Sequence, residues 1–252
     1  MSALVRAELL KLRTVALPAW LLLTTLALVL LSVAVTILTA GLEGAPLQRD
    51  DPDLLARAVA SASAGNVVLL VLGILALTQE FRFGTATPSF LVSPRRWRVL
   101  VAKLVAVSLA GLVFAVLSSL FALVTSYVLI AVRGDELVLD RTVVEVLLGV
   151  GLCLLLYGPI GVGVGALIRN QIAAVVAALA WTFIAEQLLV ALLPEVGKWT
   201  PGGATSAVLQ LGDLATTRGD LLPVWGGALL LVAYSLVLSV VAAMVTLRRD
   251  LT

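Results

Sequence analysis

One carboxylate stands well inside a long apolar segment, and its position gives it the clearest potential for chemistry in this sequence. Glu186 lies within residues 171–193, a segment with no other acidic side chain. An ionisable group inside a membrane-spanning helix is a candidate for ion coupling or for lining a translocation path. Pro194 follows soon after, so Glu186 would also lie near the end of its helix. It could then reach the outer headgroup region or cap a neighbouring helix, and the sequence leaves these roles open.

A second group of residues combines a proline with closely spaced glycines. Pro159 lies in the segment LLLYGPIGVGVGALIRN, and a proline inside a helix should kink it because it lacks a backbone N–H. Gly161 and Gly165 form a small-xxx-small pair, which permits close helix packing. The G-x-G-x-G pattern here is no nucleotide loop, because no strand or Rossmann context surrounds it. These three residues are candidates for helix packing or for a hinge along a translocation path.

The third mixed segment is the loop QEFRFGTATPSFLVSPRRWRVLVAK, residues 79–103. It combines a carboxylate, cations, aromatic residues, a glycine and prolines, a variety that a simple turn does not need. A short helix starting at Glu80 would be broken at Gly84 and Pro88, and Pro94 would start the return to the next apolar segment. Such a helix across a loop would suit contact with a partner protein. The alternative is a cationic loop that only sets the orientation of the chain.

Several kinds of chemistry are missing from the sequence. The chain has no histidine, which removes histidine metal sites and histidine-assisted nucleophiles, and its single cysteine, Cys153, lies in an apolar run. No G-x-x-x-x-G-K-[ST] phosphate loop, H-E-x-x-H or G-x-S-x-G motif occurs. We therefore expect no enzyme activity, no metal and no cofactor in this chain, and no nucleic-acid partner.

The elements that must position these residues are long apolar helices. Hydrophobic residues make up 61% of the 252-residue chain and charged residues 13%, against about 45–50% and about 25% in soluble domains. The apolar runs are continuous and too long for barrel strands. We predict an all-α integral membrane protein with a single domain, residues 1–252. Its six expected spans cover residues 17–40, 62–79, 104–132, 146–168, 171–193 and 223–247.

The segments at the two ends of this array carry further predictions. Residues 1–15 predict an amphipathic helix lying in the headgroup layer, with Leu9 and Leu12 on its apolar side and cations at its flanks. The alternative is a plain extension of the first span. Residues 194–223 are long and half apolar around TSAVLQLGDL. That segment could dip into the outer face of the membrane as a short re-entrant or interfacial helix.

The distribution of basic residues predicts the orientation. Six spans put both termini on one side, and placing that side in the cytoplasm satisfies the positive-inside rule. The outer segments then keep most of the acidic residues. The basic residues of the inner segments are Arg6, Lys11, Arg13, Arg82, Arg95, Arg96, Arg98, Lys103, Arg169, Arg248 and Arg249.

Three stretches carry a resemblance that covers nearly the whole chain. They are the start RAELLKLRT, the loop EFRFGTATPSFLVSPRRWRVLVAKL and the segment WTFIAEQLLVALLP. With these stretches, the sequence resembles the permease subunits of type-2 ATP-binding-cassette exporters, in the form common in high-GC Gram-positive bacteria. The resemblance implies a cytoplasmic interfacial helix at the start and a cytoplasmic coupling helix between spans two and three. The coupling residues it implies are Glu80, Phe81, Arg82, Phe83, Gly84 and Thr85, and the loop adds Pro94, Arg95 and Arg96.

The resemblance also implies a function and partners. The chain would form the translocation path of an exporter in the bacterial plasma membrane, paired with a second permease chain, either a twin or a paralogue. ATP and Mg²⁺ would bind to a separate ATPase subunit. Substrates in the family range across drugs, peptide antibiotics, lipids and polysaccharides. Two alternatives remain, a non-transporting sensor or immunity protein and an ion-coupled carrier that uses Glu186.

Overall fold

The computed structural model describes residues 2–42, 47–49, 51–82, 96–134, 139–168, 170–211 and 221–248. All regular structure among them is helical. Six helical segments in this part of the chain are long and apolar enough to cross a membrane, which confirms the expected number of spans. These segments are Leu17–Thr39, Leu54–Glu80, Trp97–Arg133, Arg141–Leu167, Gln171–Leu192 and Val224–Val245.

The helices follow one another with short connections. The first three long ones are α2 (Leu17–Thr39), α4 (Gly65–Arg82) and α6 (Arg96–Arg133), and a separate helix α1 (Ser2–Thr14) precedes them. The others are α3 (Leu54–Ala60), the 3₁₀ turn η1 (Ser61–Ala64), α7 (Arg141–Leu167), α8 (Gln171–Ala180), the π-helical turn η2 (Trp181–Ala185), α9 (Glu186–Leu192), α10 (Pro194–Gly197), α11 (Pro201–Val208) and α12 (Val224–Arg248).

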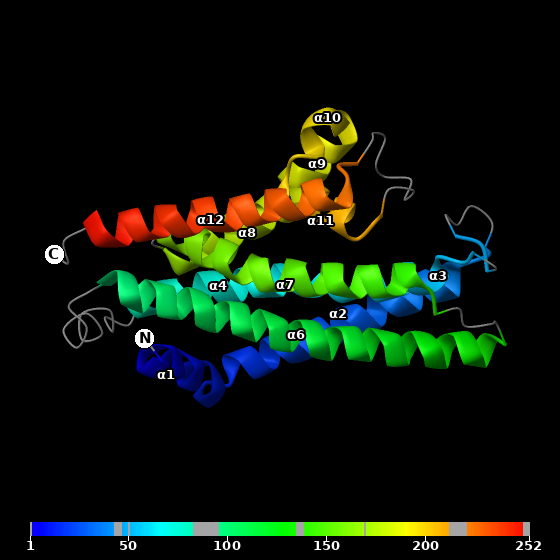
Figure 1. The fold of residues 1–252 in the computed structure, drawn as a ribbon, viewed down its shortest axis with the longest axis horizontal. Helices are drawn as coiled ribbons and strands as arrows, with labels where there is room; N and C mark the ends of the chain where they lie inside the picture. Colours follow the sequence, from blue (N-terminus) through cyan, green and yellow to red (C-terminus); the bar gives the residue numbers. More distant parts are fainter. Residues whose placement is uncertain are drawn as a thin grey trace.

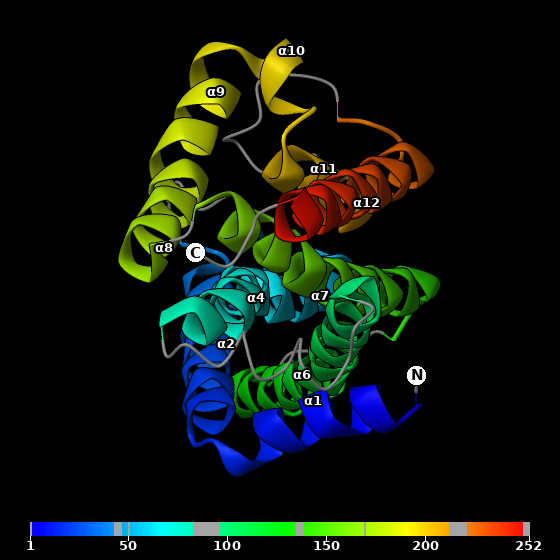
Figure 2. The same cartoon turned by 90° about the vertical axis from the view of Figure 1, so that its left-hand side faces the viewer.

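The long helices lie side by side around a central α7 (Figure 1). Helices α4, α6 and α12 pack against α7, and α2 packs against α4 and α6. The α8–η2–α9 segment runs obliquely at one side of the bundle (Figures 1 and 2). Large apolar side chains such as Leu31, Ile184 and Val237 are exposed on the outer helices. Lipid is the solvent that tolerates such a surface.

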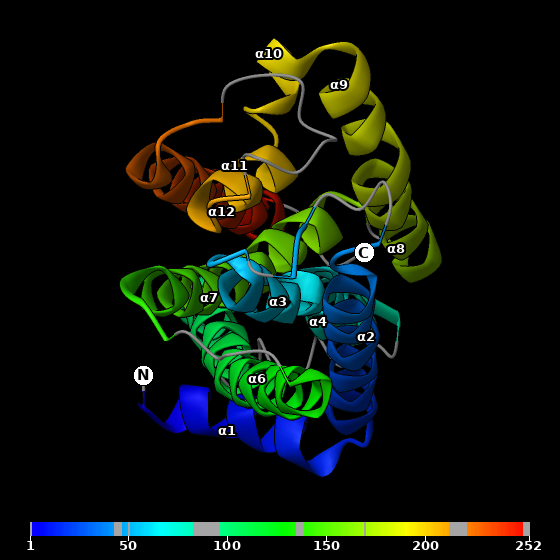
Figure 3. The same ribbon diagram turned by 90° about the vertical axis from the view of Figure 1, so that its right-hand side faces the viewer.

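The elements expected on one side of the membrane gather at one end of the bundle. Helix α1, the end of α4, the start of α6 and the end of α12 lie at the left of Figure 1. Helix α3, the start of α7 and the end of α6 lie at the other end (Figures 1 and 3). This arrangement agrees with an even number of crossings.

The second span starts earlier than the sequence predicts. The apolar helical segment runs from Leu54 through η1 to Glu80, whereas the expected span starts at residue 62. The expectation relied on uncharged windows and therefore placed Arg57 in an outer loop. A helix continues through such a residue because each added turn satisfies its own backbone hydrogen bonds. Helix α6 likewise begins at Arg96 rather than residue 104, and α7 begins at Arg141 rather than residue 146.

Glycines allow α4 and α7 to meet backbone to backbone. A Cβ atom added at Gly73 of α4 would overlap the carbonyl oxygen of Gly158. One added at Gly161 of α7 would overlap the carbonyl oxygen of Leu70. Helices can approach this closely only where side chains are absent. The α4–α7 pair is therefore the tightly packed centre of the bundle.

Gly165 and Pro159 belong to the same buried face of α7. A Cβ atom at Gly165 would lie 3.0 Å from the carbonyl oxygen of Ile74. Pro159 is buried inside α7, which remains helical from Arg141 to Leu167. These contacts support the packing interpretation of the glycines, and a hinge role for Pro159, Gly161 and Gly165 stays a prediction.

Candidate functional site

Helix α1 presents two charged residues one turn apart. Glu8 and Lys11 are three positions apart, so their side chains share one face of the helix. This face turns toward α6, against which α1 packs (Figure 2). Glu8 is buried, whereas Arg6 and Arg13 on the same helix are exposed. A buried carboxylate on a surface helix needs a cation close by.

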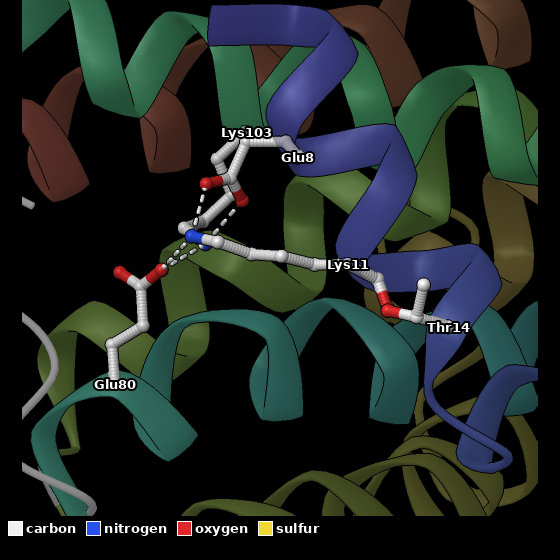
Figure 4. A network of polar contacts seen from close by, with 5 residues as sticks. All are labelled: Glu8, Lys11, Thr14, Glu80 and Lys103. Carbon is white, nitrogen blue, oxygen red and sulfur yellow. Dashed lines mark hydrogen bonds and ion pairs between the residues drawn. The ribbon is translucent and has the colours of Figure 1, made fainter.

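That cation is Lys103, two turns into α6. Its ammonium lies 2.8 Å from Oε2 of Glu8 and 2.9 Å from Oε1 of Glu80, the residue near the end of α4. The ammonium of Lys11 also contacts both carboxylates, at 2.6 Å from Oε1 of Glu8 and 3.1 Å from Oε1 of Glu80. Figure 4 shows the four side chains converging between the three helices. We call Glu8, Lys11, Glu80 and Lys103 the ion cluster.

The ion cluster is electrically balanced and largely removed from solvent. The exposed side-chain fraction is 4% for Lys103, 9% for Glu8 and 12% for Glu80, whereas Lys11 is 51% exposed. Each lysine bridges both carboxylates, so no charge in the cluster depends on one partner alone. Removing one member of a buried ion pair is strongly destabilising because the remaining charge is left uncompensated. The cluster therefore fixes α1 to the ends of α4 and α6.

The cluster stays ionised at neutral pH. Burial disfavours the charge of Glu8, but the charges and hydrogen bonds of Lys103 and Lys11 outweigh it and lower the pKa of Glu8 below its usual 4.5. Burial also disfavours the charge of Lys11, but Glu8 and Glu80 outweigh it and raise the pKa of Lys11 above 10.5. Both groups therefore carry their charges across the physiological range.

The structure places the predicted loop residues unevenly. Glu80 belongs to the ion cluster, and the guanidinium of Arg82 donates a hydrogen bond of 3.3 Å to Oε1 of Gln171, at the start of α8. Phe81 lies in the last turn of α4 and Arg96 at the first position of α6, but their side chains fall outside the described part. The other predicted coupling residues also lie outside the described residues: Phe83, Gly84, Thr85, Pro94 and Arg95.

Sequence reasoning missed Glu8 and Lys103 as site residues. It treated Lys103 as one of the cations that set the orientation and did not assign Glu8 to a site. A signal was present, because Lys103 lies well inside the helix that starts at Arg96. A cation followed by a long apolar run needs a buried carboxylate. Which carboxylate supplies it depends on helix packing, which a single sequence does not show.

Glu186 has a partner of a different kind. It is 3% exposed, and its Oε1 accepts a hydrogen bond from the backbone N–H of Gly202 in the first turn of α11. The hydroxyl of Thr200 accepts another, from the N–H of Gly203 at 3.1 Å. A Cβ atom at Gly202 would lie 2.8 Å from the carboxyl carbon of Glu186. Glu186 therefore caps the N-terminus of α11, where N–H groups lack partners within the helix.

Helix α11 turns back against the spans. The hydroxyl of Tyr157 in α7 lies 3.0 Å from that of Thr205 in α11. At Gly149 of α7, an added Cβ atom would lie 3.0 Å from the side chain of Val208. The helix starts at Pro201, earlier than the stretch TSAVLQLGDL that the sequence favours, and it ends before Gln210, whose φ is 56°. A translocation role for Glu186 stays a prediction, since the observed contact is that of a cap.

These features define a multi-pass α-helical membrane protein with a buried ion cluster at one end of its bundle. No protein-family model matches the chain, and no curated protein matches it. Among the described residues, no group of three or more acidic or cysteine side chains could hold a metal ion. The function must therefore be argued from the residues and their geometry.

Proposed function

We propose that this chain is the membrane-spanning permease subunit of an ATP-binding-cassette transporter. It forms the translocation path for export of a small molecule, peptide or lipid across the bacterial plasma membrane. A separate ATPase subunit binds ATP and Mg²⁺, and a second permease chain completes the path. Both termini lie in the cytoplasm, α1 lies in the inner headgroup layer, and residues 80–96 contact the ATPase.

The ion cluster is the observation that carries this proposal. It lies where α4 ends and α6 begins, at the two roots of the segment proposed to contact the ATPase. Lys103 joins the two roots through Glu80 and joins them to α1 through Glu8. A force on that segment is then shared by α4, α6 and α1, and through α1 by α2. A loop that only set the orientation would not need such a connection.

The proposed mechanism uses rigid helices. ATP binding brings the two ATPase subunits together, and each one pulls on residues 80–96 of its permease chain. The glycine-mediated contact of α4 with α7 carries the motion to the centre of the bundle. The spans then tilt and open the path on alternate sides. Phosphoryl chemistry takes place on the partner.

The proposal gives Glu186 a structural role rather than a part in ion coupling. Its carboxylate is buried and is engaged by the N-terminus of α11. Because α11 packs on α7 and α12, this cap holds the outer segment against the spans. Energy for transport comes from ATP, so no titrating carboxylate in the path is required.

The test is co-purification of the chain with an ATPase encoded by a neighbouring gene. Glu80 belongs to the ion cluster, so the informative variant changes the adjacent residues, Arg82→Ala with Phe83→Ala. We expect this double variant to lose ATPase association and transport-linked ATP hydrolysis while its thermal unfolding changes little. The matched control is Arg141→Ala with Glu145→Ala, an exposed pair at the far end of the bundle. Unchanged association in the Arg82 and Phe83 variant would show that the coupling assignment is wrong.

A further inference from the structure

A cavity of about 370 Å³ lies beside the ion cluster, enclosed by α1, α2, α4 and α6. Figure 2 shows these four helices around the space. Its walls are mostly apolar and include Leu12 of α1, Pro18 of α2, Leu72 and Ala76 of α4, and Val107 of α6. Ordered water needs two to four polar partners, which these walls do not offer. An apolar chain would instead gain dispersion contacts and lose its exposure to water.

One end of the cavity is polar. Lys11, Glu80 and Lys103 of the ion cluster line it, together with Gln79. The ammonium of Lys11 is half exposed and has three N–H donors, of which the two carboxylates use two within the described part of the chain. The cavity therefore combines apolar walls with a polar end, which is the layout for an amphiphile.

The exposed side of α1 next to this cavity is cationic. Arg6, Lys11 and Arg13 are exposed on α1, and its one acidic residue, Glu8, is buried against Lys103. Val15, at the junction of α1 and α2, also lines the cavity and follows Arg13 closely in the chain. Basic pockets between membrane helices attract anionic headgroups. A phosphate held by Lys11 and Arg13 would leave its chain at the cavity entrance.

We propose that this cavity binds one acyl chain of an anionic phospholipid, with the lipid phosphate on the Lys11 and Arg13 side of α1. The bound chain fills the space between α1 and the α4–α6 pair. It thereby holds α1 in the position at which Glu8 meets Lys103. The site belongs to this chain alone, and only its assignment to the cytoplasmic leaflet rests on the proposed orientation.

The test uses two photoactivatable lipids that share one diazirine-bearing acyl chain. The purified full chain is reconstituted in phosphatidylcholine nanodiscs that contain either labelled phosphatidylglycerol or labelled phosphatidylcholine. After illumination, mass spectrometry measures labelling of the α4 peptide that contains Leu72 and Ala76. We expect about fivefold more labelling by phosphatidylglycerol, the preference that one added cation gives near a membrane surface. Excess unlabelled phosphatidylglycerol should suppress it, and excess phosphatidylcholine should not.

Variants locate the site. Ala76→Phe fills the cavity and should remove most of the labelling of α4. Its matched control is Ala27→Phe, on the exposed side of α2, which should leave the labelling unchanged. Arg13→Gln lies outside the ion cluster and should reduce the preference for phosphatidylglycerol while labelling by phosphatidylcholine persists. Thermal unfolding of each variant shows whether it is folded.

Two outcomes would overturn the proposal. Labelling of Leu72 and Ala76 that persists in folded Ala76→Phe would mean that lipid reaches α4 without entering the cavity. Equal labelling by the two lipids in the unaltered protein would exclude recognition of an anionic headgroup. The competition experiment needs no variant, so the second outcome can be read even if Ala76→Phe fails to fold.

Discussion

Two short helices are fastened to this bundle by buried carboxylates, but in different ways. Helix α1 is held through Glu8, whose charge is balanced by Lys103 and Lys11. Helix α11 is held through Glu186, which accepts a hydrogen bond from the backbone N–H of Gly202. The first attachment joins ionised side chains on three helices. The second joins one side chain to the end of a helix.

The difference predicts which residue types each attachment requires. The ion cluster needs charges of both signs, because a neutral side chain at any of its positions leaves an opposite charge buried. The cap needs an acceptor at Glu186, and an amide oxygen is also an acceptor. Replacements should therefore be tolerated at Glu186 that are not tolerated at Lys103. The predictions below test this contrast.

The largest effect should come from Lys103→Met. This change removes the cation between Glu8 and Glu80 and leaves Lys11, which is half exposed, as their only partner within the cluster. We expect the free energy of unfolding to fall by about 3–5 kcal/mol. Denaturant titration in lipid nanodiscs measures this change, and hydrogen exchange should show faster exchange in α1 than in α11.

The control for Lys103 is a cation with an exposed partner. Arg141 is 92% exposed in its pair with Glu145, so Arg141→Met should change stability by less than about 1 kcal/mol. Similar losses for Lys103→Met and Arg141→Met would remove the distinction between the buried cluster and an ordinary surface pair.

The comparison assumes a rigid frame between the two attachments, and Gly73→Ala tests that frame. The added methyl group would overlap the carbonyl oxygen of Gly158 and force α4 away from α7. We expect a loss of about 1–3 kcal/mol in thermal unfolding, the usual result of overpacking. Gly151→Ala is the matched control on α7, because nothing lies within 4 Å of its added Cβ atom. It should be neutral or slightly stabilising.

At Glu186, two replacements should separate the acceptor from the charge. Glu186→Ala leaves the N–H of Gly202 without its partner and should cost about 1–3 kcal/mol. Glu186→Gln keeps an acceptor and should cost less than about 1 kcal/mol. Hydrogen exchange of α10 and α11 measures both changes. An ion-coupled carrier predicts the opposite priority, with Glu186→Gln abolishing gradient-driven transport in vesicles without ATP.

The smallest effect is the pH dependence of the attachment of α1. The pKa of Glu8 is lowered by folding, so its contribution is complete above pH 4.5 and is lost as the pH falls through its folded-state pKa. The pKa of Lys11 is raised, so its contribution is complete below pH 10.5 and is lost as the pH rises through its folded-state pKa. Hydrogen exchange in α1, corrected for intrinsic rates, should therefore be slowest in the middle of this range. A profile that Lys103→Met leaves unchanged would contradict the assignment.

The spans themselves could be predicted because lipid imposes a simple condition. Backbone polar groups must be paired inside each helix, and the side chains facing lipid must be apolar. All six spans were therefore visible in the sequence, although charged residues at their ends hid part of their lengths. Arg57 hid the start of the second span and Arg96 that of the third. A helix end is set by backbone pairing, which hydropathy does not measure.

The residues that meet in the site could not be predicted in the same way. Glu80 was identified from its loop, but its partners come from residues far away in the chain. Glu8 and Lys103 are separated by 95 positions. Likewise, Glu186 was identified as a buried carboxylate, while the choice between a cap and a translocation role required the position of α11.

The sequence alone determined that this protein is a bundle of six membrane-spanning helices, because continuous apolar runs are stable only in lipid and only as helices. It also determined that Glu186 and Lys103 need partners, since an isolated charge in an apolar segment is too costly to remain unpaired. Only the tertiary structure decided what those partners are. Helix packing places α1 against α6 and α11 beside α9, and packing depends on how whole surfaces fit together rather than on the order of residues in one segment.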